Sequence, residues 1–171
     1  MMFATADVLY LCPVDVDGFM TWSADPDFAR WPQQHRLADG ALRPAMLPVH
    51  DSGLIRPRHT AVAIIEHVLQ VLGGAPWNVK DPQSPRASRL FSVVMPGHRI
   101  ERHADEQEPA WVCRVHVPIL TNTRATFHVG GDRLHLGPVG HAFAVNARAE
   151  HEIVNEGATP RLHLMFDVVG G

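Results

Sequence analysis

The sequence lacks the features that would mark several common classes of protein. Its two cysteines, Cys12 and Cys113, cannot form a disulfide framework, which indicates a reducing compartment. A net charge of −3 gives no basic footprint for nucleic acid. The first residues have neither a basic start nor a long apolar run, so no signal peptide and no membrane span are expected. We therefore expect a cytoplasmic protein that binds neither nucleic acid nor membrane.

Histidine, by contrast, is abundant: the chain has 12 histidines and a single tyrosine. Imidazole chemistry is therefore worth testing. With 171 residues, of which 46% are hydrophobic and 19% charged, the chain can bury a full core. We expect one domain over residues 1–171. In it, residues 1–88 form an N-terminal lid and helix region, and residues 89–169 form the β core.

The region before residue 89 predicts one helix. Apolar residues recur at helical spacing within residues 58–74, and Gly73 and Gly74 provide the stop. Residues 1–59 otherwise show no sustained period and are expected to form loops with short strands. The segment 75–88 is rich in proline and polar residues, which predicts a loop.

From residue 89 onward the pattern changes to short strands separated by turn residues. The expected strands are residues 89–95, 111–120, 125–129, 133–136, 141–145, 151–155 and 161–169. Pro96 and Gly97 follow the first strand and suit the two central positions of a type II turn. This pattern predicts a mainly β fold, a double-sheet jelly roll with at least one helix packed outside it.

Two of the expected strands share an unusual alternation. Residues 114 and 116 are Arg and His, residues 161 and 163 repeat the pair, and each strand is apolar at the positions between. If the apolar rows pack between the two sheets, the Arg and His faces point outward and carry little meaning. If the Arg and His faces line the inside, they form an anion site. Alternation alone does not decide between these arrangements.

A metal site is the other hypothesis that the histidines raise. His103 and Asp105 lie two residues apart, so in an extended segment they can share one metal ion. A non-haem Fe(II) site needs two neutral imidazoles and one carboxylate, with open positions for substrate and gas. The second histidine must come from another strand, and the candidates are His116, His128, His135, His141, His151 and His163. His128, His135 and His141 also form a rival metal set.

Three motifs carry a resemblance to a known family. They are PGHRIERHAD at residues 96–105, RVHVPILTN at residues 114–122 and HEIVNEGATPRLHLMFD at residues 151–167. On these motifs the chain resembles the aspartyl/asparaginyl β-hydroxylase-like branch of the Fe(II)/2-oxoglutarate-dependent oxygenases, over roughly residues 89–167. The resemblance implies a double-stranded β-helix, the cupin-like form of the jelly roll.

The resemblance also implies roles for particular residues. His103, Asp105 and His151 correspond to the metal ligands. Arg161, ten residues after the last ligand, corresponds to the residue that pairs with the far carboxylate of 2-oxoglutarate. A guanidinium suits that task because its planar fork meets both carboxylate oxygens. Further contacts to the cosubstrate are expected from Arg114, His116 and Ser92.

The implied activity is hydroxylation of an unactivated C–H bond, with Fe(II), 2-oxoglutarate and O2 as cofactor and cosubstrates. The substrate is a free amino acid or an Asp- or Asn-type residue in a peptide. The animal enzymes of the family have Gly where this chain has Asp105, so their substrates do not transfer directly, and the acid disfavours halogenation. No catalytic side chain is expected beyond the metal ligands. The alternative is a cupin-like metal-binding protein, an isomerase, a dioxygenase or a binding module, that does not use 2-oxoglutarate.

Several arginine and tryptophan residues are candidates for contacts with the substrate. Arg89 and Trp111 are assigned to substrate binding, and Arg86 is a further candidate. Aromatic and basic residues of the N-terminal region form either a substrate lid or a cover over the barrel end: Trp22, Trp31, Arg43, Arg56 and Arg58. The sequence does not decide between a monomer and a homodimer.

Overall fold

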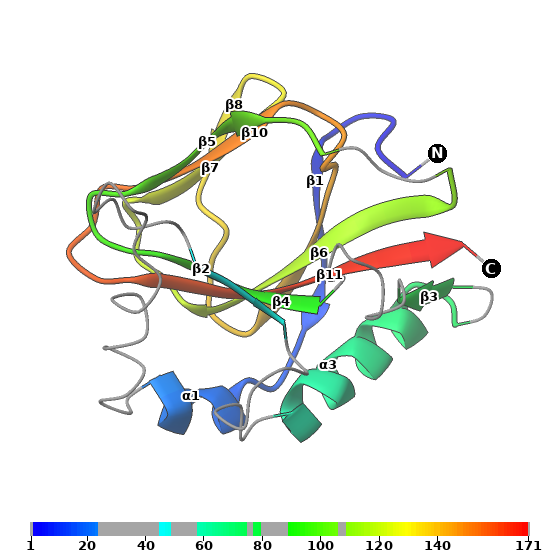
Figure 1. Cartoon of the computed structure of the whole chain (residues 1–171). Helices are drawn as coiled ribbons and strands as arrows, with labels where there is room; N and C mark the ends of the chain where they lie inside the picture. The colour runs from blue at the N-terminus through cyan, green and yellow to red at the C-terminus, as the bar shows by residue number, and fades with distance from the viewer. Residues whose placement is uncertain are drawn as a thin grey trace.

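The computed structural model describes residues 2–23, 45–48, 58–74, 77–79, 89–105 and 109–170. These residues form two antiparallel sheets and two helices, and both helices lie on the outer side of the larger sheet (Figure 1). The helices are α1 (Asp17–Ser23) and α3 (Arg58–Val71). The mainly β, jelly-roll prediction with a packed helix is confirmed.

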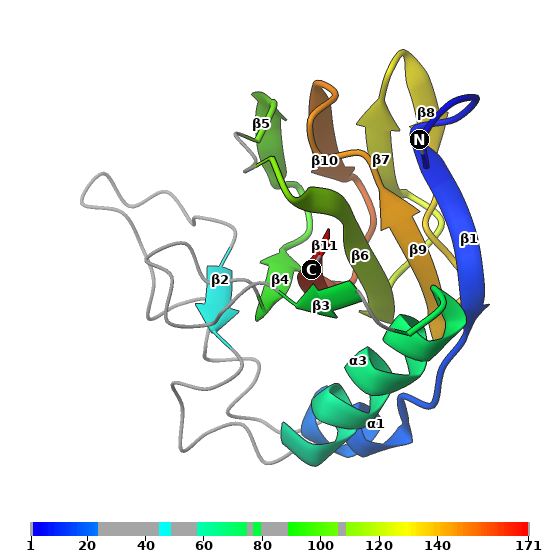
Figure 2. The ribbon, with the colours of Figure 1, turned by 90° about the vertical axis from the view of Figure 1, so that its right-hand side faces the viewer.

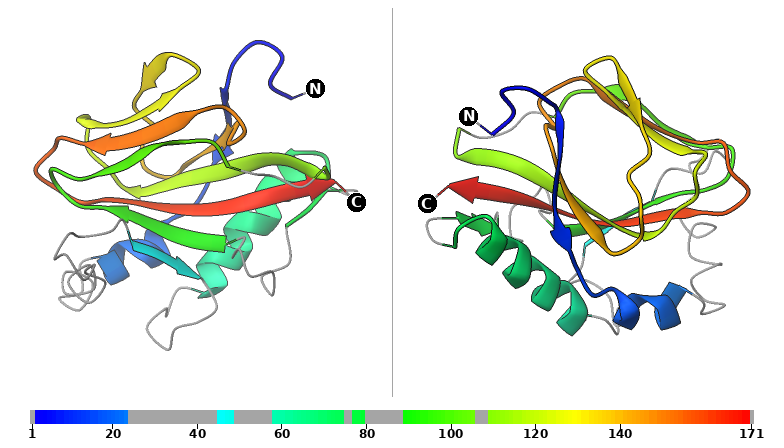
Figure 3. Two further views of the ribbon diagram at one scale, coloured as in Figure 1. Left: turned by 45° about the horizontal axis from the view of Figure 1, so that its top comes forward. Right: turned by 180° about the vertical axis from the view of Figure 1, so that it is seen from behind.

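The larger sheet has seven strands in the order β1-β9-β6-β11-β4-β2, and β3 pairs with β11 beside this path. Its strands are β1 (Val8–Pro13), β2 (Ala45–Pro48), β3 (Trp77–Val79), β4 (Arg89–Val94), β6 (Trp111–Leu120), β9 (His141–Val145) and β11 (Arg161–Gly170). The smaller sheet has four strands in the order β5-β10-β7-β8. They are β5 (Arg99–His103), β7 (Ala125–Val129), β8 (Asp132–Leu134) and β10 (His151–Asn155). The two sheets face each other across a shared interior (Figure 3).

The predicted helix α3 covers the outer face of the larger sheet (Figure 2). Its buried side chains recur at helical spacing and join one apolar cluster with residues of β4, β6 and β11. The helix members are Ala61, Ile64, Ile65 and Val68, and the sheet members include Val115, Val117, Leu164 and Phe166. The helix ends at Val71, and the expected stop follows it at Gly73 and Gly74, which have positive φ angles of 111° and 71°.

This packing decides the question that alternation left open. Because the apolar rows of β6 and β11 pack against α3, the Arg and His rows on the opposite face point into the interior between the sheets. His116 illustrates this, since its ring lies 5.5 Å from Phe127 of the smaller sheet. Arg161 and His163 are likewise buried, with 3% and 1% of their surfaces exposed. Of the two arrangements, the structure therefore shows the one in which the Arg and His faces line the interior.

A tight turn and a buried amide fix the end of the barrel next to this interior. His98 N–H donates to the carbonyl of Met95 across Pro96 and Gly97, and Gly97 has a φ of 76°, as a type II turn requires. The fully buried Asn155 donates to the carbonyls of Val94 and Thr159. These bonds hold the connection between β10 and β11 against β4.

Several elements differ from the sequence expectation. β5 was missed because three of its five residues are charged and exposed, so it shows no apolar alternation. β3 falls within the segment expected to be a loop, and α1 has only 7 residues, too few for a periodic signal. β8 begins at Asp132 and ends at Leu134, earlier than predicted. No helix in the described part of the chain has both the length and the apolar character that a membrane crossing needs.

Candidate metal centre

The register of β5 and β10 brings two distant histidines together. His103, the last residue of β5, is the direct partner of His151, the first residue of β10. Their ring centroids are 4.4 Å apart. Directly opposed residues in an antiparallel pair have close side chains, so strand pairing alone places both imidazoles at one point.

Asp105 joins these histidines from the segment that follows β5. Its backbone N–H donates to the carbonyl of Ala147, just before β10, at 2.9 Å. Its Oδ1 lies 3.9 Å from His103 Nε2, and its Oδ2 lies 3.9 Å from His151 Nε2. One ligand atom from each of the three residues lies within 4.8 Å of the others. Among the described residues this is the one His, Cys, Asp or Glu group of that kind.

Both imidazoles are held in the tautomer that a metal requires. His103 Nδ1–H donates to the carbonyl of Glu101 at 2.6 Å, and His151 Nδ1–H donates to the carbonyl of Ala149 at 2.9 Å. A carbonyl oxygen can only accept, so the proton sits on Nδ1 and the lone pair on Nε2. Both Nε2 atoms face Asp105. The donor set, two neutral imidazoles and one carboxylate, fits non-haem Fe(II).

Burial increases from one side of this group to the other. The side chain of His103 is 40% exposed, that of Asp105 is 27% exposed and that of His151 is 6% exposed. Burial lowers the pKa of His151, which keeps its ring neutral and able to bind a metal at neutral pH. The group therefore lies at the rim of the interior, with His103 on the solvent side.

Arg161 lies deeper in the interior, at the start of β11. Its Nη1 lies 3.3 Å from Ser92 Oγ on β4, and its Nη2 lies 2.8 Å from His163 Nδ1 and 3.5 Å from His116 Nδ1. A guanidinium can only donate, so both imidazoles accept through Nδ1. Burial, followed by the charge of Arg161, lowers the pKa of His116 and of His163 well below the ordinary value. The cation is therefore surrounded by neutral groups.

Within the described residues, Arg161 has no carboxylate partner, although it is almost fully buried. Burial lowers its pKa to about 9. An isolated buried charge is costly, and an anion that binds beside it recovers part of that cost. We refer to His103, Asp105 and His151 as the metal-type group. Phe127 connects this group with the surroundings of Arg161, because its ring centroid is 5.5 Å from those of both His116 and His151. The Arg161 cluster, formed by Arg161, Ser92, His116 and His163, and the candidate metal site are thus neighbours.

Arg114 occupies a different position from the other predicted cosubstrate contacts. Its Nε and Nη2 donate to the two carboxylate oxygens of Asp167 at 2.9 Å each, and its Nη1 donates to Asp105 Oδ2. Burial alone would lower its pKa, but Asp167 and then Asp105 outweigh this and raise it. The structure therefore groups Ser92, His116 and Arg161, and sets Arg114 beside the predicted metal ligand.

The remaining candidates lie elsewhere. Trp111 is 5% exposed, its ring stacks 6.4 Å from Phe3, and its Nε1–H donates to Asp167 at 3.2 Å. Arg89 starts β4, but its side chain is outside the described residues. The side chains of the proposed lid residues and of Arg86 are also outside them: Trp22, Trp31, Arg43, Arg56 and Arg58. Substrate binding by Arg89 and Trp111 stays a prediction.

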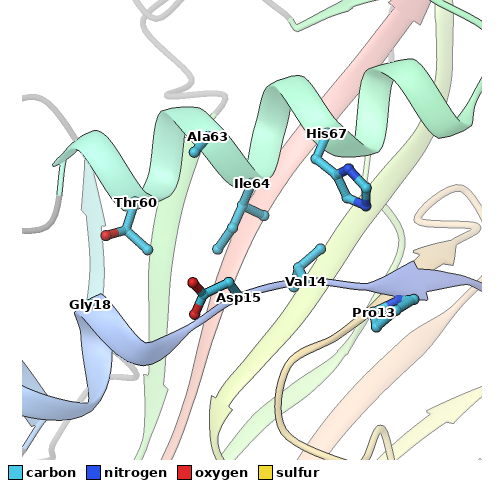
Figure 4. A pocket seen from close by; sticks show the side chains of 8 residues that line it. All are labelled: Pro13, Val14, Asp15, Gly18, Thr60, Ala63, Ile64 and His67. Atoms are coloured by element: carbon cyan, nitrogen blue, oxygen red, sulfur yellow. The ribbon is translucent and has the colours of Figure 1, made fainter.

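The rival metal set is not brought together. His128 lies 3.4 Å from Glu152 on the smaller sheet, His135 bonds to the carbonyl of Ala125, and His141 packs against Tyr10 at the edge of the larger sheet. A separate pocket of about 750 Å³ lies between α3 and the segment after β1 (Figure 4). It contains His67 and Asp15 but none of the three residues of the metal-type group.

Two residues that belong to the site were not assigned by the sequence. His163 contacts Arg161, and Asp167 holds Arg114. Both lie on the inner face of β11, at two and six residues after Arg161, so the period of two that paired Arg161 with His163 could also have found Asp167.

Comparison with solved structures finds the same fold at low sequence identity. EvdMO1 is 13% identical with a TM-score of 0.69 over 96% of this chain, which spans 47% of EvdMO1. AviO1 from Streptomyces viridochromogenes is 11% identical with a TM-score of 0.67, covering 95% of this chain and 89% of that one. A prolyl hydroxylase from Trichoplax adhaerens, in complex with a peptide fragment of hypoxia inducible factor, is 9% identical with a TM-score of 0.62, covering 96% and 84%.

No curated protein sequence matches the chain significantly. The family model described as aspartyl/asparaginyl beta-hydroxylase, however, matches residues 57–170, which is more than half of the chain. The match contains every residue of the metal-type group and of the Arg161 cluster. The chain thus belongs to the aspartyl/asparaginyl β-hydroxylase family.

Proposed function

We propose that His103, Asp105 and His151 hold the Fe(II) and that the chain hydroxylates a C–H bond of an amino acid or of an Asp- or Asn-type residue in a peptide. Bound iron, together with 2-oxoglutarate and O2, supplies the oxidising power, and 2-oxoglutarate is converted to succinate and carbon dioxide. The protein's own residues bind and orient the reactants and exclude water.

The observation that carries this proposal is the buried Arg161, which has no carboxylate partner in the described part of the chain. Its charge is not cancelled by the hydroxyl of Ser92 or by the neutral rings of His116 and His163, so it stays available to an anion. A dicarboxylate that reaches from the metal group to Arg161 would pair its far carboxylate with the planar fork of the guanidinium. Ser92 Oγ can add a further hydrogen bond.

The exposure gradient supports different sides for the two reactants. The anion site lies on the buried side, beyond Phe127, whereas His103 and Asp105 are partly exposed. The substrate therefore approaches from the solvent side of His103, and the cosubstrate occupies the interior.

Anaerobic titration tests the proposal before any substrate is known. Fe(II) should bind the protein, and 2-oxoglutarate should then produce a weak visible absorption band that Arg161→Met greatly reduces at the same concentrations. Absence of the band with folded, iron-loaded wild-type protein would contradict the use of 2-oxoglutarate at this site.

Succinate release then defines the substrate class. The purified protein is supplied with Fe(II), 2-oxoglutarate and O2 and screened with free amino acids and with Asp- and Asn-containing peptides. Turnover with one class and not with the other assigns it. Stimulation by neither class would overturn the proposed substrates while leaving the cofactor assignment in place.

A further inference from the structure

The guanidinium of Arg114 is occupied by two carboxylates, those of Asp105 and Asp167, and so is not free to bind the cosubstrate. Each of its three nitrogen atoms already donates to a carboxylate oxygen of one or the other. We propose that Arg114 is a positioning residue for the metal ligand Asp105, and that Asp167 and Trp111 form the support that holds Arg114 in place. This inference rests on the proposed function, since it takes Asp105 as a ligand of the iron.

The support begins with strand register. Asp167 on β11 is the direct partner of Arg114 on β6, and their side chains lie on the same inner face. Two parallel hydrogen bonds of 2.9 Å join the guanidinium to both oxygens of Asp167. Asp167 Oδ1 also accepts the indole N–H of Trp111 at 3.2 Å. With side-chain exposures of 15% for Arg114 and 7% for Asp167, the pair is shielded from water.

Asp105 needs such a partner because it lies beyond the end of β5. Its backbone is fixed by one bond to Ala147, and its side chain is 27% exposed. Arg114 donates to Oδ2, while Oδ1 has no hydrogen bond within the described residues. A carboxylate that binds a metal through one oxygen is oriented by a donor on the other, and loss of such a donor commonly weakens metal binding.

Charge balance explains why a guanidinium can stand next to a metal ion. A lone cation at this position would repel the metal. Because Asp167 neutralises Arg114, the pair orients Asp105 while adding no net charge to the centre. Arg161, whose described contacts are all neutral, has the opposite arrangement and keeps its charge for an anion.

Metal affinity measured without turnover tests this assignment. Anaerobic calorimetric titration with Fe(II) should show binding to Arg114→Lys that is about 10- to 100-fold weaker than to the wild type, because lysine keeps the charge and loses the fork. Asp167→Asn should act in the same direction. Trp111→Phe removes one N–H from the support and should give a smaller loss. Near-ultraviolet circular dichroism confirms that each variant is folded, and Trp111→Phe and Arg114→Lys keep the test informative if Asp167→Asn does not fold.

A double-mutant cycle separates positioning from a general structural role. In an Asp105→Ala background, Arg114→Lys should cause no further loss of Fe(II) affinity, since its target is gone. Arg102→Gln is the matched control, because it removes an exposed arginine that pairs with Glu152, and it should change Fe(II) affinity by less than about threefold.

The possible results are distinct. Wild-type affinity in Arg114→Lys, or a loss that persists in the Asp105→Ala background, would overturn the positioning role. Weaker binding of 2-oxoglutarate with unchanged Fe(II) affinity would also overturn it and would assign Arg114 to the cosubstrate. Failure of the wild type itself to bind Fe(II) would instead refute the proposed function.

Discussion

The two faces of the larger sheet are built from the same strands but bury different kinds of side chain. On the outer face of β6 and β11, side chains such as Val117 and Leu164 pack against α3 and form the main core. On the inner face, the same strands bury His116, Arg161, and His163. Because the helix supplies the outer face with a hydrophobic partner, the inner face can bury polar groups that would destabilise an ordinary core. Residues that stabilise the fold and residues of the proposed site therefore lie on opposite faces of the same strands.

The largest expected effect comes from a substitution in the metal-type group, at the rim of the inner face. His151→Ala should abolish turnover and weaken Fe(II) binding by orders of magnitude, because it removes one of the three proposed ligands. Calorimetric titration with Fe(II) and succinate release measure the two effects. His141→Ala, which alters a histidine of the rival set, is the control and should behave as the wild type. Normal succinate production by His151→Ala would show that the ligand assignment is wrong.

The outer face should respond in stability and not in ligand binding. Leu164→Ala should lower the free energy of unfolding by about 2 to 5 kcal/mol, because it opens a cavity in the fully buried cluster under α3. Chemical denaturation measures this, and the affinity of the folded variant for 2-oxoglutarate should remain near that of the wild type. Val62→Ala, at an exposed position of α3, should change stability by less than about 0.5 kcal/mol. A strong loss of cosubstrate affinity in Leu164→Ala would break the separation of the two faces.

Arg161→Met should produce the reverse pattern. Binding of 2-oxoglutarate to the Fe(II)-loaded protein should weaken by about 2 to 5 kcal/mol, because a buried carboxylate loses its charged partner. The free energy of unfolding should stay the same or rise, since an unpaired buried cation is replaced by an apolar chain of similar length. Arg133→Met, in an exposed surface pair with Glu156, is the control and should leave both quantities nearly unchanged. Unchanged cosubstrate affinity in Arg161→Met would move the anion site elsewhere.

The smallest expected effect is a dependence of stability on pH. Burial, then Arg161, lowers the pKa of His116 and of His163 in the folded chain, so below about pH 6.5 the unfolded chain binds more protons than the folded chain. The free energy of unfolding should therefore decrease as the pH falls from 7.5 to 5.5, by up to about 1.4 kcal/mol per pH unit for each histidine. In His163→Leu the decrease should be smaller. Equal slopes in the two proteins would mean that His163 does not contribute.

The strands that could be predicted from the sequence are those with one buried apolar face. β6, β7, β9 and β10 have the predicted bounds, because apolar and polar residues alternate along them or they form short apolar runs ended by turn residues. β5 was not predicted, although it carries His103, because three of its other four residues are charged and exposed. The ligand triad itself came from family motifs and not from periodicity, since spacing alone left six histidines as partners for His103.

The partners of Arg114 could not be predicted from the sequence. The sequence placed Arg114 and His116 on one face and assigned both to the cosubstrate. In the structure the neighbouring strand places Asp167 beside Arg114 and His163 near His116, so two residues of the same row have different partners. Pairing register between distant strands determines this difference, and a single sequence does not encode it in any local pattern.

The two proposed ligand imidazoles are each anchored to a backbone carbonyl two residues earlier in the chain, which has a consequence for variation of the sequence. Every residue type offers a carbonyl oxygen, so Glu101 and Ala149 can change in evolution without disturbing the proton positions of His103 and His151. A slip of one residue between β5 and β10 would instead turn one imidazole to the other side of the sheet. The centre therefore tolerates substitution around its histidines far better than an insertion or deletion within either strand.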